Sequence, residues 1–168
     1  MNRLRHWCAV IAMSLGAYCV PAQAIEQAPV TTVVRLYRDF AWEAVFDTAT
    51  TGQTLLIDQP ATVLKIYFTH RLAKLLVEDR RCAVRTREIC KLDFQPIWAS
   101  QDSAAMDLKI ETETPVSNVV TVKYRYPSTG ELLQMKYDLT HTAAGWRISD
   151  IRYQSGISLL GVLEAKRK

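Results

Sequence analysis

Glycine-rich loops and the common catalytic motifs are missing from this sequence. Its 6 glycines are scattered along the chain, so it has no phosphate-binding glycine loop and no G-x-S-x-G motif of serine hydrolases. The metalloprotease motif H-E-x-x-H is also missing. We therefore assign no catalytic residue, no metal site and no cofactor, and we favour a non-enzymatic role over an enzymatic one.

The chain also lacks a strong excess of charge. It has 21 Lys and Arg against 17 Asp and Glu, a net charge of +4. Two of the basic residues, Arg3 and Arg5, lie in an N-terminal segment that we expect to be removed, which leaves 19 − 17 = +2. Binding to phosphate backbones needs a concentrated basic surface. Nucleic acid is therefore not expected as the main partner.

The uncharged apolar run over residues 7–20 is too short to cross a membrane. It has about fourteen residues, and a span needs roughly 18. Basic residues precede it and Ala22-Gln23-Ala24 follows, the small-x-small pattern that a signal peptidase cleaves. We predict a signal peptide over residues 1–24, no span in the mature chain and a periplasmic location. An uncleaved anchor and lipidation at Cys19 are the alternatives.

Two of the 4 cysteines leave with the signal, and Cys82 and Cys90 remain as a pair. In an oxidising compartment such a pair is expected to form a disulfide. Eight residues of helix would separate the two by about 12 Å, whereas bridged Cα atoms lie under about 7 Å apart. The helix that carries Cys82 must therefore end before Cys90. A zinc site with His70 or His141 is disfavoured, because the short paired spacing of zinc ligands is missing.

Helical periodicity predicts two helices before the sheet. The first starts at Thr31 or Thr32 and runs to about Asp47, with an apolar stripe that leaves Glu43 on the other side. The second opens at 59–62 and continues to about Arg81. Ser158 is expected to cap a short C-terminal helix.

Period-two alternation predicts strands over 106–111, 118–126, 133–139 and 145–153. The last run changes phase near Ser149 and Asp150, which indicates a β-bulge. We expect Asp150 to pair with Arg147 or Arg152. The fold class is therefore α+β: two N-terminal helices packed on a curved antiparallel sheet of about four strands. Residues 25–168 are expected to form one domain, with a concave space that is either filled or able to hold a ligand.

Three short segments have a recognisable pattern: Leu92-Asp93-Phe94-Gln95-Pro96, Ser100-Gln101-Asp102 and Gly145-Trp146-Arg147-Ile148-Ser149-Asp150-Ile151. With the order of helices and strands, this pattern resembles a family of exported bacterial proteins of unknown function within the nuclear transport factor 2-like superfamily. The resemblance covers about residues 31–163 and implies a cone-shaped fold. Such proteins often have an acid where this chain has Gln95, so a paired-carboxylate role is not expected here. No activity transfers, since this scaffold hosts enzymes, ligand binders and protein-binding modules.

Two groups of residues are candidate binding sites. The disulfide loop is basic and is either a solvated turn or a docking patch for an acidic partner. The candidate partner-binding residues are Arg80, Arg81, Arg85, Arg87 and Lys91. The second possibility is a pocket for a small apolar ligand. Its candidate residues are Asp93, Trp98, Asp102, Tyr124, Tyr137 and Trp146. These side chains are also suited to filling the core or closing turns.

The favoured function is a periplasmic interaction module that binds another exported or envelope protein, for example an immunity protein that neutralises a toxin. A small-ligand binder, or a cyclase- or isomerase-like enzyme that uses the cone cavity, is the alternative. No oligomeric state is predicted.

Overall fold

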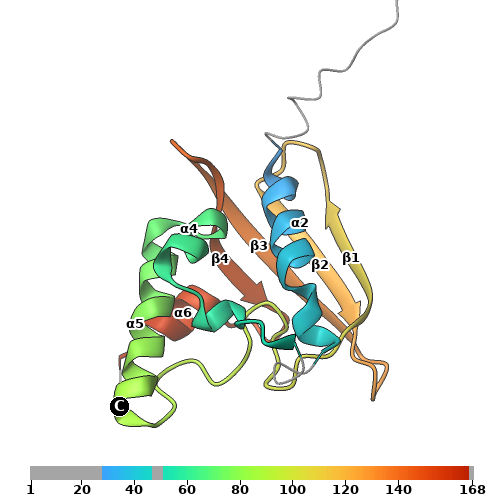
Figure 1. Ribbon diagram of the computed structural model, residues 1–168. Helices are drawn as coiled ribbons and strands as arrows, with labels where there is room; N and C mark the ends of the chain where they lie inside the picture. The colour runs from blue at the N-terminus through green and yellow to red at the C-terminus, as the bar shows by residue number, and fades with distance from the viewer. Residues whose placement is uncertain (1–27, 47–50, 167–168) are drawn as a thin grey trace, which may run out of the picture.

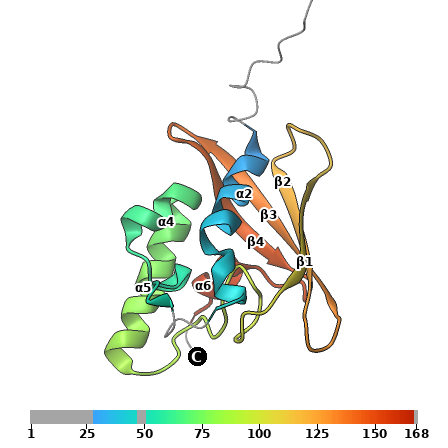
Figure 2. The same ribbon diagram turned by 45° about the vertical axis from the view of Figure 1, so that its right-hand side comes forward.

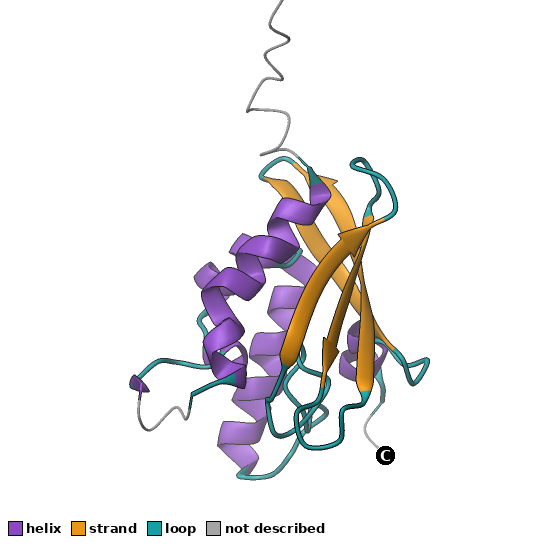
Figure 3. Cartoon of the chain, turned by 90° about the vertical axis from the view of Figure 1, so that its right-hand side faces the viewer, coloured by secondary structure: helices purple, strands orange, loops and turns teal. Residues whose placement is uncertain are grey.

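A computed structural model describes residues 28–46 and 51–166 of the chain. The expected signal peptide, with its cleavage site, lies outside the described residues. The described chain is an α+β structure in two layers, in which helices α2, α4 and α5 cover one face of a four-stranded antiparallel sheet (Figure 3).

The first helix, α2, spans Pro29–Phe40 and lies across the sheet (Figure 1). It starts earlier than expected because Pro29 occupies the first turn, where its missing N–H costs nothing. Thr31 does not cap it; its hydroxyl donates to the Ala28 carbonyl at 2.7 Å. The expected extension to Asp47 is shortened, since the chain continues as the 3₁₀ turn η1, Ala41–Ala44.

The second expected helix is interrupted and forms α4, Ala61–Tyr67, and α5, His70–Thr86. Between them, Phe68 forms a parallel bridge with Ile148. The Thr69 N–H donates to the Ile148 carbonyl at 2.9 Å. The break therefore covers part of the free edge of the last strand, which an uninterrupted helix would leave unpaired. Helical periodicity did not reveal this, because the partner lies about eighty residues away.

The sheet has the order β1-β2-β3-β4, with strands Met106–Thr112, Val119–Arg125, Leu132–Thr142 and Gly145–Tyr153. The predicted alternation is confirmed in the two central strands and the last one. Leu133 and Trp146 of the predicted apolar set are half-buried. The other inward side chains are buried against the helices: Val120, Val122, Tyr124, Met135, Tyr137, Leu139, Ile148 and Ile151.

Strand β1 forms the edge farthest from α5 (Figure 2) and departs from simple alternation. Its register shifts between Met106 and Lys109, and Asp107 has a φ of 57°. This bulge leaves Met106 42% and Leu108 37% exposed, although both belong to the apolar set of the predicted strand. A bulged, charged edge resists pairing with another chain.

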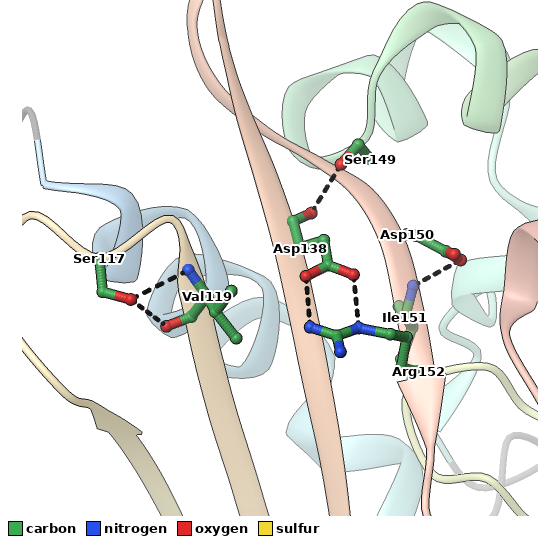
Figure 4. Close-up of polar contacts among 7 residues, drawn as sticks. All are labelled: Ser117, Val119, Asp138, Ser149, Asp150, Ile151 and Arg152. Atoms are coloured by element: carbon green, nitrogen blue, oxygen red, sulfur yellow. Dashed lines mark hydrogen bonds and ion pairs between the residues drawn. The ribbon is translucent and has the colours of Figure 1, made fainter. Parts of the chain in front are cut away.

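The predicted bulge in β4 is confirmed and centres on Ser149 (Figure 4). Asp138 pairs with Asp150 and Leu139 with Ile148, so Ser149 is the extra residue. The expected pairing of Asp150 with an arginine is wrong. Its carboxylate accepts the N–H groups of Ile151 and Leu160, each at 2.8 Å, the second in the first turn of helix α6.

The arginine that we expected beside Asp150 has another partner. Arg152 binds Asp138 through two hydrogen bonds of 2.7 and 2.6 Å, as Figure 4 shows. Asp138 lies next to Asp150 across the bulge. At the bulge, the Asp150 carboxylate thus faces helix α6 and the Asp138 carboxylate binds the Arg152 guanidinium.

The disulfide and the last helix follow the sequence predictions. Cys82 and Cys90 are bridged with Cα atoms 6.1 Å apart. Helix α5 ends at Thr86, and Arg87 takes the left-handed conformation that closes a helix. Helix α6, Leu159–Glu164, packs between α5 and β4, and the Ser158 hydroxyl accepts the Gly161 N–H at 3.1 Å.

Candidate functional site

The concave face of the sheet is packed with tyrosines that hold the loop over residues 92–102. The Tyr37 hydroxyl donates to the Ile97 carbonyl at 2.7 Å and lies 2.7 Å from the Tyr137 hydroxyl. Tyr153 donates to the Pro96 carbonyl at 3.1 Å, and Tyr124 donates to the Trp98 carbonyl. The loop is therefore attached to the core at its centre, residues 96–98.

Burial sets the protonation state of these tyrosines. It raises the pKa of Tyr37, Tyr137 and Tyr153 well above the ordinary value, and that of Tyr124 as well. Their hydroxyls stay protonated, so Tyr37, Tyr124 and Tyr153 donate to the loop carbonyls, and Tyr137 bonds the Tyr37 hydroxyl. The space that the sequence left open as a cone interior is thus occupied by side chains that work as structural supports.

The predicted pocket residues divide into three groups. Trp98, Tyr124 and Tyr137 lie fully buried in the core. Trp146 is half-buried and packs edge-on against His141, with ring centroids 5.1 Å apart. Both predicted carboxylates, Asp93 and Asp102, are exposed. The structure does not bring the six together into one site.

Sequence reasoning missed Glu43, which is 6% exposed. Its carboxylate accepts the Leu56 N–H at 2.6 Å and the Trp98 indole N–H at 3.1 Å. Burial raises the pKa of Glu43 in spite of these two bonds. The residue ties η1, the segment before α4 and the 92–102 loop together. Nothing in its helical context indicates this, because both partners come from distant loops.

A hollow of about 540 Å³ opens where this loop meets the ends of β3 and β4. We call it the mouth hollow. Its lining contains two carboxylates and three glutamine amides but no Lys, Arg or His: Asp93, Phe94, Ala99, Ser100, Gln101, Glu131, Leu133, Gln134, Met135, Tyr153, Gln154, Ser155 and Ile157. Of the predicted pocket residues, Asp93 lines it.

The end of α5 and the disulfide loop present the opposite chemistry. We call the exposed residues Arg81, Val84, Arg85, Arg87 and Ile89 the arginine tip. No ion pair joins its arginines to any described residue, and Val84 and Ile89 are 63% and 69% exposed. The other two predicted basic residues are engaged internally. Arg80 pairs with Asp58, and the Lys91 ammonium donates to the Leu163 carbonyl.

A groove of about 510 Å³ runs from the arginine tip to the 92–102 loop, and we call it the tip groove. Arg87 and Ile89 line it on the tip side, and Gln95 and Gln101 on the loop side. The side-chain oxygen of Gln95 is buried without a hydrogen-bond partner among the described residues. Such an oxygen calls for a donor.

Neither a metal-binding cluster nor a membrane-spanning helix is present in the part of the chain that the structure describes. No group of three or more His, Cys, Asp or Glu side chains lies close enough to hold a metal ion between residues 28–46 and 51–166. Over the same residues, no helix has both the length and the apolar character that crossing a membrane requires.

Comparison with known proteins gives no family assignment. Neither a protein-family model nor a curated protein matches this chain. Among solved structures, the chain is similar to a phospholipid-binding protein from Ralstonia solanacearum, at 11% identity and a TM-score of 0.32. The match covers 85% of this chain and 72% of the other. A likeness this distant carries no weight for fold or ligand, so the two surfaces must be judged on their own chemistry.

Proposed function

We propose that this chain is a non-enzymatic, exported binding module that docks an acidic segment of another exported protein on the arginine tip. A protein that neutralises a toxin, as immunity proteins do, is one concrete form of this function. We also propose that the fold is nuclear transport factor 2-like, and that the chain is periplasmic after signal cleavage. Support comes from the helical layer on an open antiparallel sheet and from a disulfide that suits an oxidising compartment.

One observation carries the proposal: three exposed arginines without carboxylate partners among the described residues and two exposed aliphatic side chains lie in one short segment, residues 81–89. A solvated charged turn would account for the arginines alone. Val84 and Ile89 add apolar side chains that are 63% and 69% exposed. Protein interfaces combine such apolar contacts with arginine, whose planar guanidinium binds carboxylates through two hydrogen bonds.

The arginine tip is also held in place before any partner arrives. The disulfide closes it, and the Lys91 N–H donates to the Asp79 carboxylate at 2.9 Å. A preorganised surface loses less conformational entropy on binding.

The test compares capture of envelope proteins by three versions of residues 25–168 with the disulfide intact. The tip variant carries Arg81→Glu, Arg85→Glu and Arg87→Glu. The control variant carries Arg35→Glu, Lys109→Glu and Lys136→Glu, which changes the net charge equally at positions that form no ion pair with a described residue.

We expect wild type and control to retain the same stoichiometric protein and the tip variant to lose it, with affinity reduced at least about 100-fold, because three attractive charges become repulsive. Circular dichroism of the tip variant checks that α5 is intact, since glutamates oppose the dipole at a helix C-terminus. Equal capture by a folded tip variant would exclude the arginine tip as the docking surface.

A further inference from the structure

We propose that the mouth hollow is a separate binding site for an organic cation with an apolar body, such as an arylalkyl amine. The site borders the 92–102 loop, as the tip groove does, and the inference does not depend on the proposed docking function. Nothing in the tip enters its lining.

The apolar part of the ligand has a preformed wall. Phe94 packs edge-on against Tyr153 with ring centroids 5.2 Å apart, and Leu133 and Met135 continue this wall along β3. Ile157 stands at the rim, 50% exposed. A volume of about 540 Å³ lies within the range of ligand sites, which are mostly apolar with a few polar groups.

The charge of the ligand follows from the polar part of the lining. Asp93 and Glu131 are both exposed at the hollow and form no ion pair with a described residue. Since no cationic side chain lines the hollow, a phosphate or carboxylate would find no opposite charge there and would be repelled by the two carboxylates. A cation is attracted by both carboxylates, and the two aromatic residues Phe94 and Tyr153 line the same hollow.

The glutamine side chains add hydrogen bonding without charge. Gln101, Gln134 and Gln154 lie at the hollow, and each amide can both donate and accept. Gln154 is already oriented, because its side-chain oxygen accepts the Gln134 backbone N–H at 3.2 Å. The amine hydrogens of a ligand therefore find neutral acceptors beside the two carboxylates.

The loop that forms one side of the hollow adopts a strained conformation. Ala99 has a φ of 48°, which residues other than glycine rarely adopt, within a turn closed by the Gln95 N–H and the Ser100 carbonyl at 2.8 Å. Burial of Trp98 next to it holds the turn. Strained backbone of this kind gathers at ligand sites, where a fixed shape serves recognition.

The experiment titrates ¹⁵N-labelled protein, residues 25–168, with three probes that share one ring and chain: 4-phenylbutylamine, 4-phenylbutanol and 4-phenylbutyrate. We expect the amine to shift the amide signals of Gln101, Gln134 and Gln154 and to bind at least about tenfold more tightly than the carboxylate. Equal affinity for amine and carboxylate would overturn the inference, as would the absence of shifts at these residues with every probe up to about 10 mM.

Matched variants test whether the carboxylates of Asp93 and Glu131 cause the preference for the amine. Asp93→Asn with Glu131→Gln keeps shape and removes both charges, so the amine should weaken about tenfold, to the level of the alcohol. Asp102→Asn removes an exposed carboxylate of the same loop that does not line the hollow, and should leave the affinity unchanged. Unchanged amine binding in the double variant, or an equal loss in Asp102→Asn, would contradict the assignment.

Discussion

The arginine tip and the mouth hollow flank one loop and carry opposite charge. Asp93, Phe94 and Gln101 line both the tip groove and the mouth hollow, so the two hollows are neighbours. One side offers unpaired arginines, and the other offers carboxylates and amides without a cation. Although the net charge of this chain is small, the two surfaces carry opposite local charge. The local charge, not the net charge, decides what each surface can bind.

The two regions also differ in what holds them in place. The arginine tip depends on α5 and the disulfide. The loop beside the mouth hollow depends on the buried tyrosines, Trp98 and Glu43. Changes can therefore be chosen that damage one region and leave the other intact.

Trp98→Ala should have the largest effect and should act on the mouth hollow. It empties the space of a fully buried indole and leaves Glu43 without one of its two donors. We expect a loss of about 3–5 kcal/mol in the free energy of unfolding, measured by urea denaturation. Amine binding should be lost, while the chemical shifts of Arg81 and Arg85 stay in place. Movement of those tip signals would show that the two regions are not separable.

Removing the disulfide with Cys82→Ala and Cys90→Ala should act on the arginine tip. The chain-entropy estimate for so short a loop is about 2.5 kcal/mol, again measurable by urea denaturation. The affinity of the mouth hollow for 4-phenylbutylamine should not change, because the loop beside it is anchored to the core independently. A drop in amine affinity in the double alanine variant would contradict this separation.

Glu43→Gln should have the smallest effect, and its signature is pH dependence. Burial raises the pKa of Glu43 above its ordinary value of 4.5. Stability from such a group is fully present below the unfolded pKa and is lost as the pH rises through the folded pKa. The variant should therefore gain stability relative to wild type between about pH 4 and pH 7, by less than about 1.5 kcal/mol.

The measurement is urea denaturation of both proteins across this pH range, with Asp102→Asn as the control. Asp102 is exposed, so its variant should follow the wild-type pH profile. A constant difference between Glu43→Gln and wild type at every pH would show that the buried carboxylate does not titrate differently in the folded state.

The parts of the fold that the sequence predicted are those in which the signal is local. Alternation in β2 and β3, the phase change at Ser149, the Ser158 cap and the Cys82–Cys90 pair each depend on residues near one another in the chain. The helix break at Phe68 depends on Ile148, a partner in another strand. Periodicity over a short window contains no information about such a partner.

The candidate sites were predicted less well, for the same physical reason. Alternation correctly predicts that Tyr124 and Tyr137 face the helices. Whether they line a cavity or fill it depends on what else occupies the space between the sheet and the helices. Here the carbonyls of the 92–102 loop and Tyr37 occupy it. Likewise, the basic residues of the disulfide loop look equivalent in sequence, although Arg80 forms an ion pair with Asp58 and the Lys91 ammonium donates to the Leu163 carbonyl.

The most direct test of the central claim is a crossed binding measurement by calorimetry. Wild type, the triple arginine-to-glutamate tip variant and the Asp93→Asn, Glu131→Gln variant are each titrated with 4-phenylbutylamine and with an acetylated peptide of alternating Glu and Leu. The account predicts that the tip variant loses the peptide at least about tenfold and keeps the amine, and that the hollow variant does the reverse. If either variant weakens both ligands equally, the two surfaces do not bind independently and the account is contradicted.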